Sequence, residues 1–119
     1  MVEIEWTEKS TRHIQAIYEY ITSDSRIYAE KYIKSLIVST EKLKKMPKCG
    51  RIVPEFENYL LREIIFKSHR IVYRFEERRN KIQILAVVHH SQDVWKTIWG
   101  FEYFIEKKKA LEKSAFLFF

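Results

Sequence analysis

The sequence predicts an α+β domain in which a short strand and two helices precede a mostly antiparallel sheet. Three observations support this prediction. Apolar residues recur at helical spacing before Pro47, a period of two replaces this pattern after Gly50, and three strand-like segments then follow with connectors of hairpin length. The chain has 119 residues, of which 46% are hydrophobic, which is enough for one domain with a core of its own. The expected order is β-α-α-β-β-β.

The N-terminal part is expected to form a strand and a helical hairpin. Residues 2–6, VEIEW, alternate apolar and acidic side chains as a half-buried strand does, and Thr7 can cap the helix that follows. Residues 22–25, TSDS, separate two helices, and Pro47 ends the second one. So short a connection predicts antiparallel packing. The helical stripes are Ile14, Ile17, Tyr18 and Ile21, and then Ala29, Tyr32, Ile33, Leu36, Thr40 and Leu43.

The remaining strands are expected at residues 60–66, 69–77 and 80–89. Before them, Pro54 confines the short segment RIVPEF to a sheet edge or a strand end. In the last strand, apolar residues on both faces predict a central, doubly buried position. The face expected to be shared holds Ile82, Ile84, Ala86 and Val88, with Leu85 and Val87 on the other.

Residues 1–99 are expected to form the domain, and residues 100–119 a C-terminal extension that is helical. The extension ends in AFLFF, which is costly to leave in water at roughly 25 cal/mol per Å² of apolar surface. It is therefore predicted to pack on the domain or on a partner or second copy, and a disordered tail is the alternative.

Composition and charge restrict the function. Residues 1–59 hold 10 basic and 9 acidic residues, whereas residues 60–119 hold 12 and 7, so the sheet half favours an anionic partner such as a nucleic acid or an acidic protein. No secretory signal and no membrane-spanning run of roughly 18 apolar residues occur, which predicts a cytoplasmic protein without membrane contact. Cys49 is the single cysteine, and no cluster has metal-ligand spacing, so neither a metal nor a cofactor is expected.

Basic residues of the predicted strands are the candidates for binding an anion. Arg62 is expected to share a surface with Arg70 and Arg74 if their strands are neighbours, with Lys67 in the connector between them. Guanidinium groups bind phosphate or carboxylate through two hydrogen bonds and stay charged at any working pH. The alternative is that these arginines are solvated or form ion pairs across strands, as Arg62–Glu76 or Arg70–Glu63.

Two histidines, His89 and His90, follow one another where the last strand ends. Alternation predicts that they point to opposite faces of the sheet. An imidazole with a pKa near neutrality can act as the acid or base when a 2′-hydroxyl attacks its own phosphodiester. The alternative is a hydrogen-bonded strand-end residue beside a solvated one.

Together these segments resemble the RelE/ParE superfamily of toxins from bacterial type II toxin–antitoxin systems, which includes plasmid stabilisation proteins. The segments GRIVPEF, LLREI, HRIVYRF and KIQILAVVHHSQD carry the resemblance, which extends from Ile4 to about Trp95. Its most specific parts are the Arg62-Glu63 dipeptide, the run RIVYR at 70–74, and Val88-His89.

The resemblance implies a small growth-inhibiting toxin and a cognate antitoxin that neutralises it by wrapping a segment round it. The expected assembly is a toxin–antitoxin heteromer or a homo-oligomer. ParE-like members poison DNA gyrase, and RelE-like members cut mRNA on the ribosome without a metal. Arg70 matches an arginine of the cleaving members. However, two other residues of the cleaving members have no match here. Gln92 replaces a second arginine that commonly follows the last strand, and Trp95 and Trp99 lie near the position of a C-terminal tyrosine. Both differences count against RNA cleavage.

The resemblance therefore predicts a gyrase-binding toxin in which Arg62, Lys67, Arg70 and Arg74 contact the target. One alternative is a metal-independent mRNA endoribonuclease in which Arg62, Arg70, His89 and His90 are catalytic. A second alternative is an inactive relic that only binds its antitoxin and acts as a co-repressor.

Overall fold

A computed structural model describes residues 1–54 and 61–91, and residues 55–60 and 92–119 lie outside this description. The described chain begins with strand β1 (Glu3–Trp6), helix α1 (Glu8–Thr22), helix α2 (Arg26–Ser39) and the 3-10 helix η1 (Glu41–Lys44). The strands β2 (Arg51–Ile52), β3 (Arg62–Phe66), β4 (His69–Glu76) and β5 (Lys81–His89) follow, with the 3-10 helix η3 (Glu77–Arg79) before β5. The predicted extension at 100–119 lies outside the described residues.

Polar caps start both helices as predicted. The Thr7 hydroxyl accepts a hydrogen bond from the Ser10 N–H at 3.2 Å, and the Ser25 hydroxyl accepts one from the Tyr28 N–H at 3.1 Å. The second helix ends earlier than expected, at Ser39, because the chain tightens into η1. Leu43 was predicted to continue the buried stripe of the second helix. It is buried, but it lies on η1 and not on α2.

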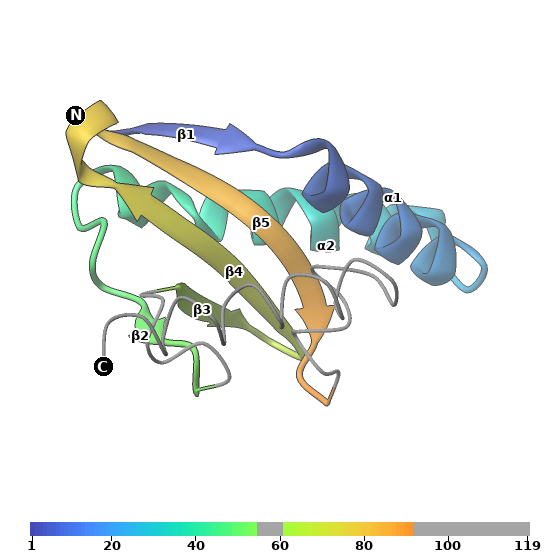
Figure 1. Cartoon of the computed structure of the whole chain (residues 1–119). Coiled ribbons are helices and arrows are strands. Elements are labelled where there is room, and N and C mark those ends of the chain that lie inside the picture. The colour runs from blue at the N-terminus through green and yellow to red at the C-terminus, as the bar shows by residue number, and fades with distance from the viewer. Residues whose placement is uncertain (55–60, 92–119) are drawn as a thin grey trace.

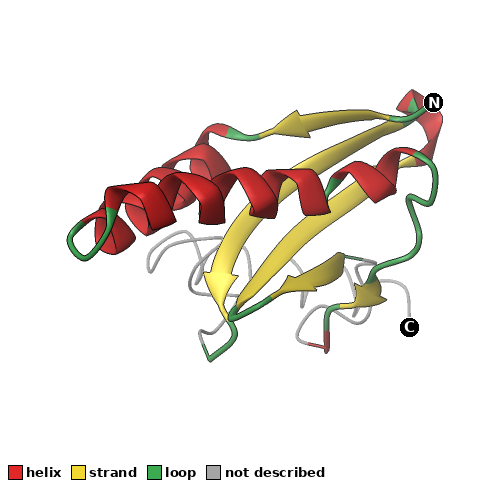
Figure 2. Ribbon diagram, turned by 180° about the vertical axis from the view of Figure 1, so that it is seen from behind, coloured by secondary structure: helices red, strands yellow, loops and turns green. Residues whose placement is uncertain are grey.

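The five strands form one sheet in the order β1-β5-β4-β3-β2. β1 pairs with β5 in parallel, and the other neighbours are antiparallel. Both helices lie on the same face of this sheet, as the two opposite views in Figures 1 and 2 show. This confirms the α+β class, the internal position of the last strand between two neighbours, and the edge position of the two-residue strand before Pro54. In the described part of the chain, no helix is long and apolar enough to cross a bilayer.

The main core lies between the helices and the sheet, where Tyr32 and Leu36 of α2 pack with Ile71 and Tyr73 of β4. A smaller apolar cluster lies on the opposite face, which we call the far face. It consists of Val53, Leu61, Val72, Ala86 and Val88. The sheet is therefore apolar on both faces in its middle.

A β-bulge in β5 changes which residues share a face. Tyr73 pairs with Ile84, but its neighbour Val72 pairs with Ala86, so Leu85 is an extra residue. Ile82 and Ile84 accordingly belong to the main core, whereas Ala86 and Val88 belong to the far-face cluster. The prediction that these four residues share one face is wrong for this reason.

Helix α1 satisfies backbone groups of β5 beyond the end of β1. The Thr7 hydroxyl donates to the Ile84 carbonyl at 2.8 Å, and Nδ1 of His13 accepts a hydrogen bond from the Val87 N–H at 3.1 Å. Burial, with Lys9 and Arg12 nearby, lowers the pKa of His13, which favours the neutral ring that this acceptor role requires. These contacts fix the helical hairpin against the central strand.

Candidate functional site

Arg70 is buried in a charge triad on the far face and is only 7% exposed. Its Nε donates to Oε2 of Glu63 at 2.5 Å, and Nε of Arg51 donates to Oε1 of the same carboxylate at 2.6 Å. The predicted Arg70–Glu63 pair is thus confirmed. The expectation that Arg70 presents an open cationic surface is wrong for the described structure, because its pairing with a fully buried carboxylate holds it inside.

Arg62 lies on the other face of the sheet, where it fastens the segment before β2. The register places Arg62 opposite Tyr73 and Arg70 opposite Ile65, so the two arginines point to opposite faces. Nη1 of Arg62 donates to the Lys48 and Gly50 carbonyls at 3.2 Å and 2.8 Å. The prediction that Arg62 shares a surface with Arg70 and Arg74 is therefore wrong.

Tyr73 also binds the segment before β2 through its hydroxyl group. Its hydroxyl donates to the Pro47 carbonyl at 2.8 Å and accepts from the Gly50 N–H at 3.0 Å. Burial raises the pKa of Tyr73, so this hydroxyl keeps its proton and can serve both bonds. Arg62 and Tyr73 together shape the chain between η1 and β2, which is a structural role.

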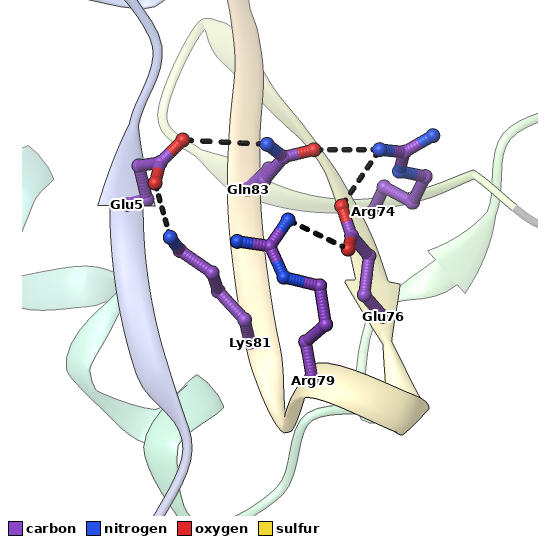
Figure 3. Close-up of polar contacts among 6 residues, drawn as sticks. All are labelled: Glu5, Arg74, Glu76, Arg79, Lys81 and Gln83. Carbon is purple, nitrogen blue, oxygen red and sulfur yellow. Dashed lines mark hydrogen bonds and ion pairs between the residues drawn. The ribbon is translucent and has the colours of Figure 1, made fainter.

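Arg74 belongs to a polar ladder across β4, β5 and β1 on the far face (Figure 3). Its Nη2 donates to Glu76 and to Gln83, both at 2.7 Å, and Gln83 donates to Glu5 at 3.3 Å. Arg79 also binds Glu76 at 3.3 Å, so Glu76 is occupied by these two and not by Arg62, and that predicted pair is wrong. Lys81 pairs with Glu5, and the hydrogen bond from Lys81 lowers the pKa of Glu5. Arg74 remains exposed, so its predicted contact with a target stays a prediction.

The histidines lie together where β4 begins and β5 ends, which is the end of this strand pair away from Glu76 and Lys81. His69, the first residue of β4, pairs with His89, the last residue of β5, and their ring centroids are 5.9 Å apart. The rings of His89 and His90 are 4.3 Å apart and tilted by 39°. The expectation that His89 and His90 point to opposite faces is wrong because the strand ends at His89 and His90 turns with the chain.

Tyr32 and Lys67 complete this group, which we call the histidine cluster: Tyr32, Lys67, His69, His89 and His90. The Tyr32 hydroxyl lies 2.7 Å from Nδ1 of His69. Lys67 has a left-handed backbone, with φ of 52°, and its Nζ lies 5.3 Å from the centroid of the Tyr32 ring and 5.6 Å from that of Phe66. Burial raises the pKa of Tyr32, and burial followed by the charges of His89 and His90 lowers the pKa of His69.

Sequence reasoning identified Lys67, His89 and His90 but missed Tyr32 and His69. His69 could have been found, because a two-residue connector places the start of one strand beside the end of the strand that pairs with it. Tyr32 could not, because its spacing fits the buried helix stripe in which it also takes part. Within the described residues, no group of three or more His, Cys, Asp or Glu side chains is arranged to hold a metal ion.

Chemically, the histidine cluster brings imidazole and ammonium groups at the surface together with the buried phenol of Tyr32. His89, His90 and Lys67 are exposed, and His69 is half-buried. Such groups can bind an oxyanion and can transfer a proton near neutral pH. The far-face arginines are instead engaged with carboxylates, and Arg62 with backbone carbonyls. The arginines predicted to contact a target thus divide between the two faces of the sheet.

The comparisons agree with this fold. Residues 4–94 match the family described as the ParE toxin of the type II toxin–antitoxin system, parDE. A solved structure titled "Chromosomal ParDE TA system from P. aeruginosa" is similar with a TM-score of 0.60 and 21% sequence identity, over 75% of this chain and 96% of that one. A comparison with proteins of curated description gave no match.

The helical hairpin on one face of a mostly antiparallel sheet is the fold that this chain shares with that solved structure. Because the match spans most of its length, the chain belongs to the ParE toxin family of type II toxin–antitoxin systems. Three residues of the sequence distinguish this chain from the mRNA-cleaving members, and they lie outside the described part of the structure. They are Gln92, Trp95 and Trp99.

Proposed function

We propose that this chain is the toxin of a type II pair that inhibits growth by binding DNA gyrase, and that a cognate antitoxin neutralises it. The match of residues 4–94 to the ParE toxin family carries this proposal. The state of the arginines supports it. Arg70 is paired with Glu63 in the interior, and Arg62 is bonded to the chain before β2, so neither is presented as a phosphate clamp of a nuclease.

Expression of this chain alone is expected to slow bacterial growth and to induce the SOS response while mRNA stays intact. The reason is that poisoned gyrase leaves breaks in the DNA, which induce the SOS response, whereas the mRNA is not cleaved. Growth curves, an SOS reporter and a supercoiling assay with purified gyrase measure these effects, and co-expression of the antitoxin should restore growth. Normal growth with abundant folded protein would contradict the proposal and favour the inactive relic.

A metal-independent endoribonuclease is the second candidate, and the convergence of His69, His89 and His90 favours it. Three imidazoles within ring-contact distance can supply both an acid and a base for 2′-hydroxyl attack.

If the chain is a nuclease, mapping of mRNA 5′ ends after induction should show codon-associated cuts. These cuts are expected to fall at least about 100-fold in a His89→Asn/His90→Asn double variant, since removal of general acid–base groups typically costs about 10²–10⁴ in rate. A Lys42→Asn variant on η1 is the control and should still cut. Intact transcripts in growth-arrested cells would exclude this function.

A further inference from the structure

The apolar cluster of the far face is buried, although both helices of the described chain lie on the opposite face of the sheet (Figures 1 and 2). Ala86 and Val72 are fully buried, and so is the side chain of Glu63 beside them. Side chains of a strand stand roughly perpendicular to the sheet, so the space above one as short as that of alanine is open to water on an uncovered face. A further part of the protein therefore covers the middle of the far face.

The covered area consists of the far-face cluster together with Glu63 and Arg70, and we call it the far-face band. Its limits are sharp. In one row across the sheet, Ile65 is 54% exposed, its neighbour Arg70 is 7% exposed, and Val88 beside Arg70 is 1% exposed. The band begins at Val88, next to the last residue of β5, and runs diagonally across β4 to Val53 after β2. Its occupant must cross the face in this direction.

The occupant belongs to the same chain, because these side chains are buried within a single chain. Residues 55–60 and 92–119 are the two parts outside the description. Residues 55–60 join β2 to β3, and six residues that go out and return reach at most about 10 Å. Val88 is about 16 Å from Leu61, because it lies two strands away and four residues along. Residues 55–60 are therefore too short to cover the band at Val88.

Residues 92–119 suit the far-face band in position, length and composition. They follow β5, which ends beside Val88, so the segment begins at one end of the band. A helix over residues 101–115 is about 22 Å long, which is close to the length of the band, about 20 Å. The segment ends in AFLFF, which is apolar throughout and is costly to leave in water.

We propose that residues 92–119 pack across the far-face band of their own chain and close it to water. The segment starts beside Val88, its helical part crosses β4, and AFLFF lies over β2 and β3 at the other end. This contact keeps the Glu63–Arg70 ion pair in apolar surroundings, where the attraction of opposite charges is stronger than in water. While the segment is in place, neither an antitoxin nor a target reaches the band. This holds for a gyrase-binding toxin and for a nuclease alike.

The reaction of single cysteines with a thiol reagent, in the full chain, tests the proposal. In a Cys49→Ala background, Ala86→Cys places a thiol in the far-face band. Val87→Cys places one in the main core under the helices, and Ile65→Cys places one at an exposed position outside the band. The thiols at the first two positions are expected to react slowly and the thiol at the third rapidly. Rapid reaction of Ala86→Cys in this chain would overturn the proposal.

A second set of chains carries Phe116→Ser, Leu117→Ser and Phe118→Ser, which weaken the proposed occupant. Ala86→Cys should then react at least about tenfold faster, because the contact loses apolar surface and opens more often. Val87→Cys should stay as slow as before, which shows that the domain is still folded. An unchanged rate at Ala86→Cys, or an equal rise at both positions, would assign the segment another place.

Dilution distinguishes the chain's own segment from other occupants. Protection of Ala86→Cys that is independent of protein concentration, in a chain that light scattering shows to be monomeric, supports the proposal. Protection that is lost as a dimer dissociates assigns the far-face band to a second copy, and protection that appears only after the antitoxin is added assigns it to the antitoxin. Either result overturns the proposal. Growth and gyrase assays do not enter this test, so its outcome is independent of the proposed function.

Discussion

Replacing Glu63 by glutamine is expected to lower the free energy of unfolding by about 3–5 kcal/mol, as removal of one partner of a buried ion pair does. The Glu63 side chain is fully buried, with one carboxylate oxygen on Arg51 and the other on Arg70. Glutamine keeps the shape but offers one acceptor, and its amide N–H groups would face a guanidinium. Arg70 would then be a buried charge without its carboxylate. Urea unfolding followed by circular dichroism measures the loss.

Two further variants show whether the buried charge is the cause. Glu30→Gln removes a carboxylate from the exposed Arg26–Glu30 pair on α2 and should leave stability nearly unchanged. A Glu63→Gln/Arg70→Met double variant should recover part of the loss, because the isolated charge is removed. An unfolding midpoint of Glu63→Gln equal to that of the parent chain would contradict the assigned role of the triad.

The second large effect is expected at Gly50, where alanine should cost about 2–3 kcal/mol through overpacking. A Cβ atom there would lie 2.6 Å from the Glu63 carbonyl oxygen and 2.7 Å from the Tyr73 hydroxyl. The nearer obstacle is backbone of β3, which cannot rotate away. Displacing Gly50 would also strain the bonds that its N–H makes with Tyr73 and its carbonyl with Arg62.

Cys49→Ala is the matched control for Gly50→Ala. Cys49 is the neighbouring residue and is exposed, so its substitution should change the free energy of unfolding by less than about 0.5 kcal/mol. Thermal or urea unfolding of both variants under one set of conditions makes the comparison. Equal stability of the two variants would show that the chain before β2 yields more readily than these contacts indicate.

Most of the fold could be predicted because local patterns determine it. Thr7 and Ser25 are caps that need only their own next residues, and the alternation of Ile71, Tyr73 and Phe75 marks one face of β4 whatever lies beside it. The bulge at Leu85 has no such local mark. It arises where two strands must pair, and a single extra residue moves Ala86 and Val88 to the other face.

The candidate site was harder to predict for the same physical reason. Whether Arg62 and Arg70 share a face depends on the register of β3 and β4, which strand sequences alone leave open. The burial of Arg70 depends on its ion pair with Glu63, which the strand sequences offer only as one of two cross-strand pairings. Alternation of side chains between the two faces holds only within β5, which ends at His89, so it does not place His90. Where the chain turns, their rings came together in place of separating.

The parallel pairing of β1 with β5 has a consequence for the order of folding. Glu3 pairs with Lys81 and Trp6 with Ile84, so the first strand of the chain meets its partner only across most of the described sequence. A ribosome must therefore complete residues 81–84 before the sheet can acquire its N-terminal edge. Pairing across so long a separation is slow compared with the closure of the α1–α2 and β3–β4 hairpins. The nascent chain consequently carries an unpaired strand and an incompletely covered core until residues 81–84 have been made, so the sheet is completed only after both hairpins can form.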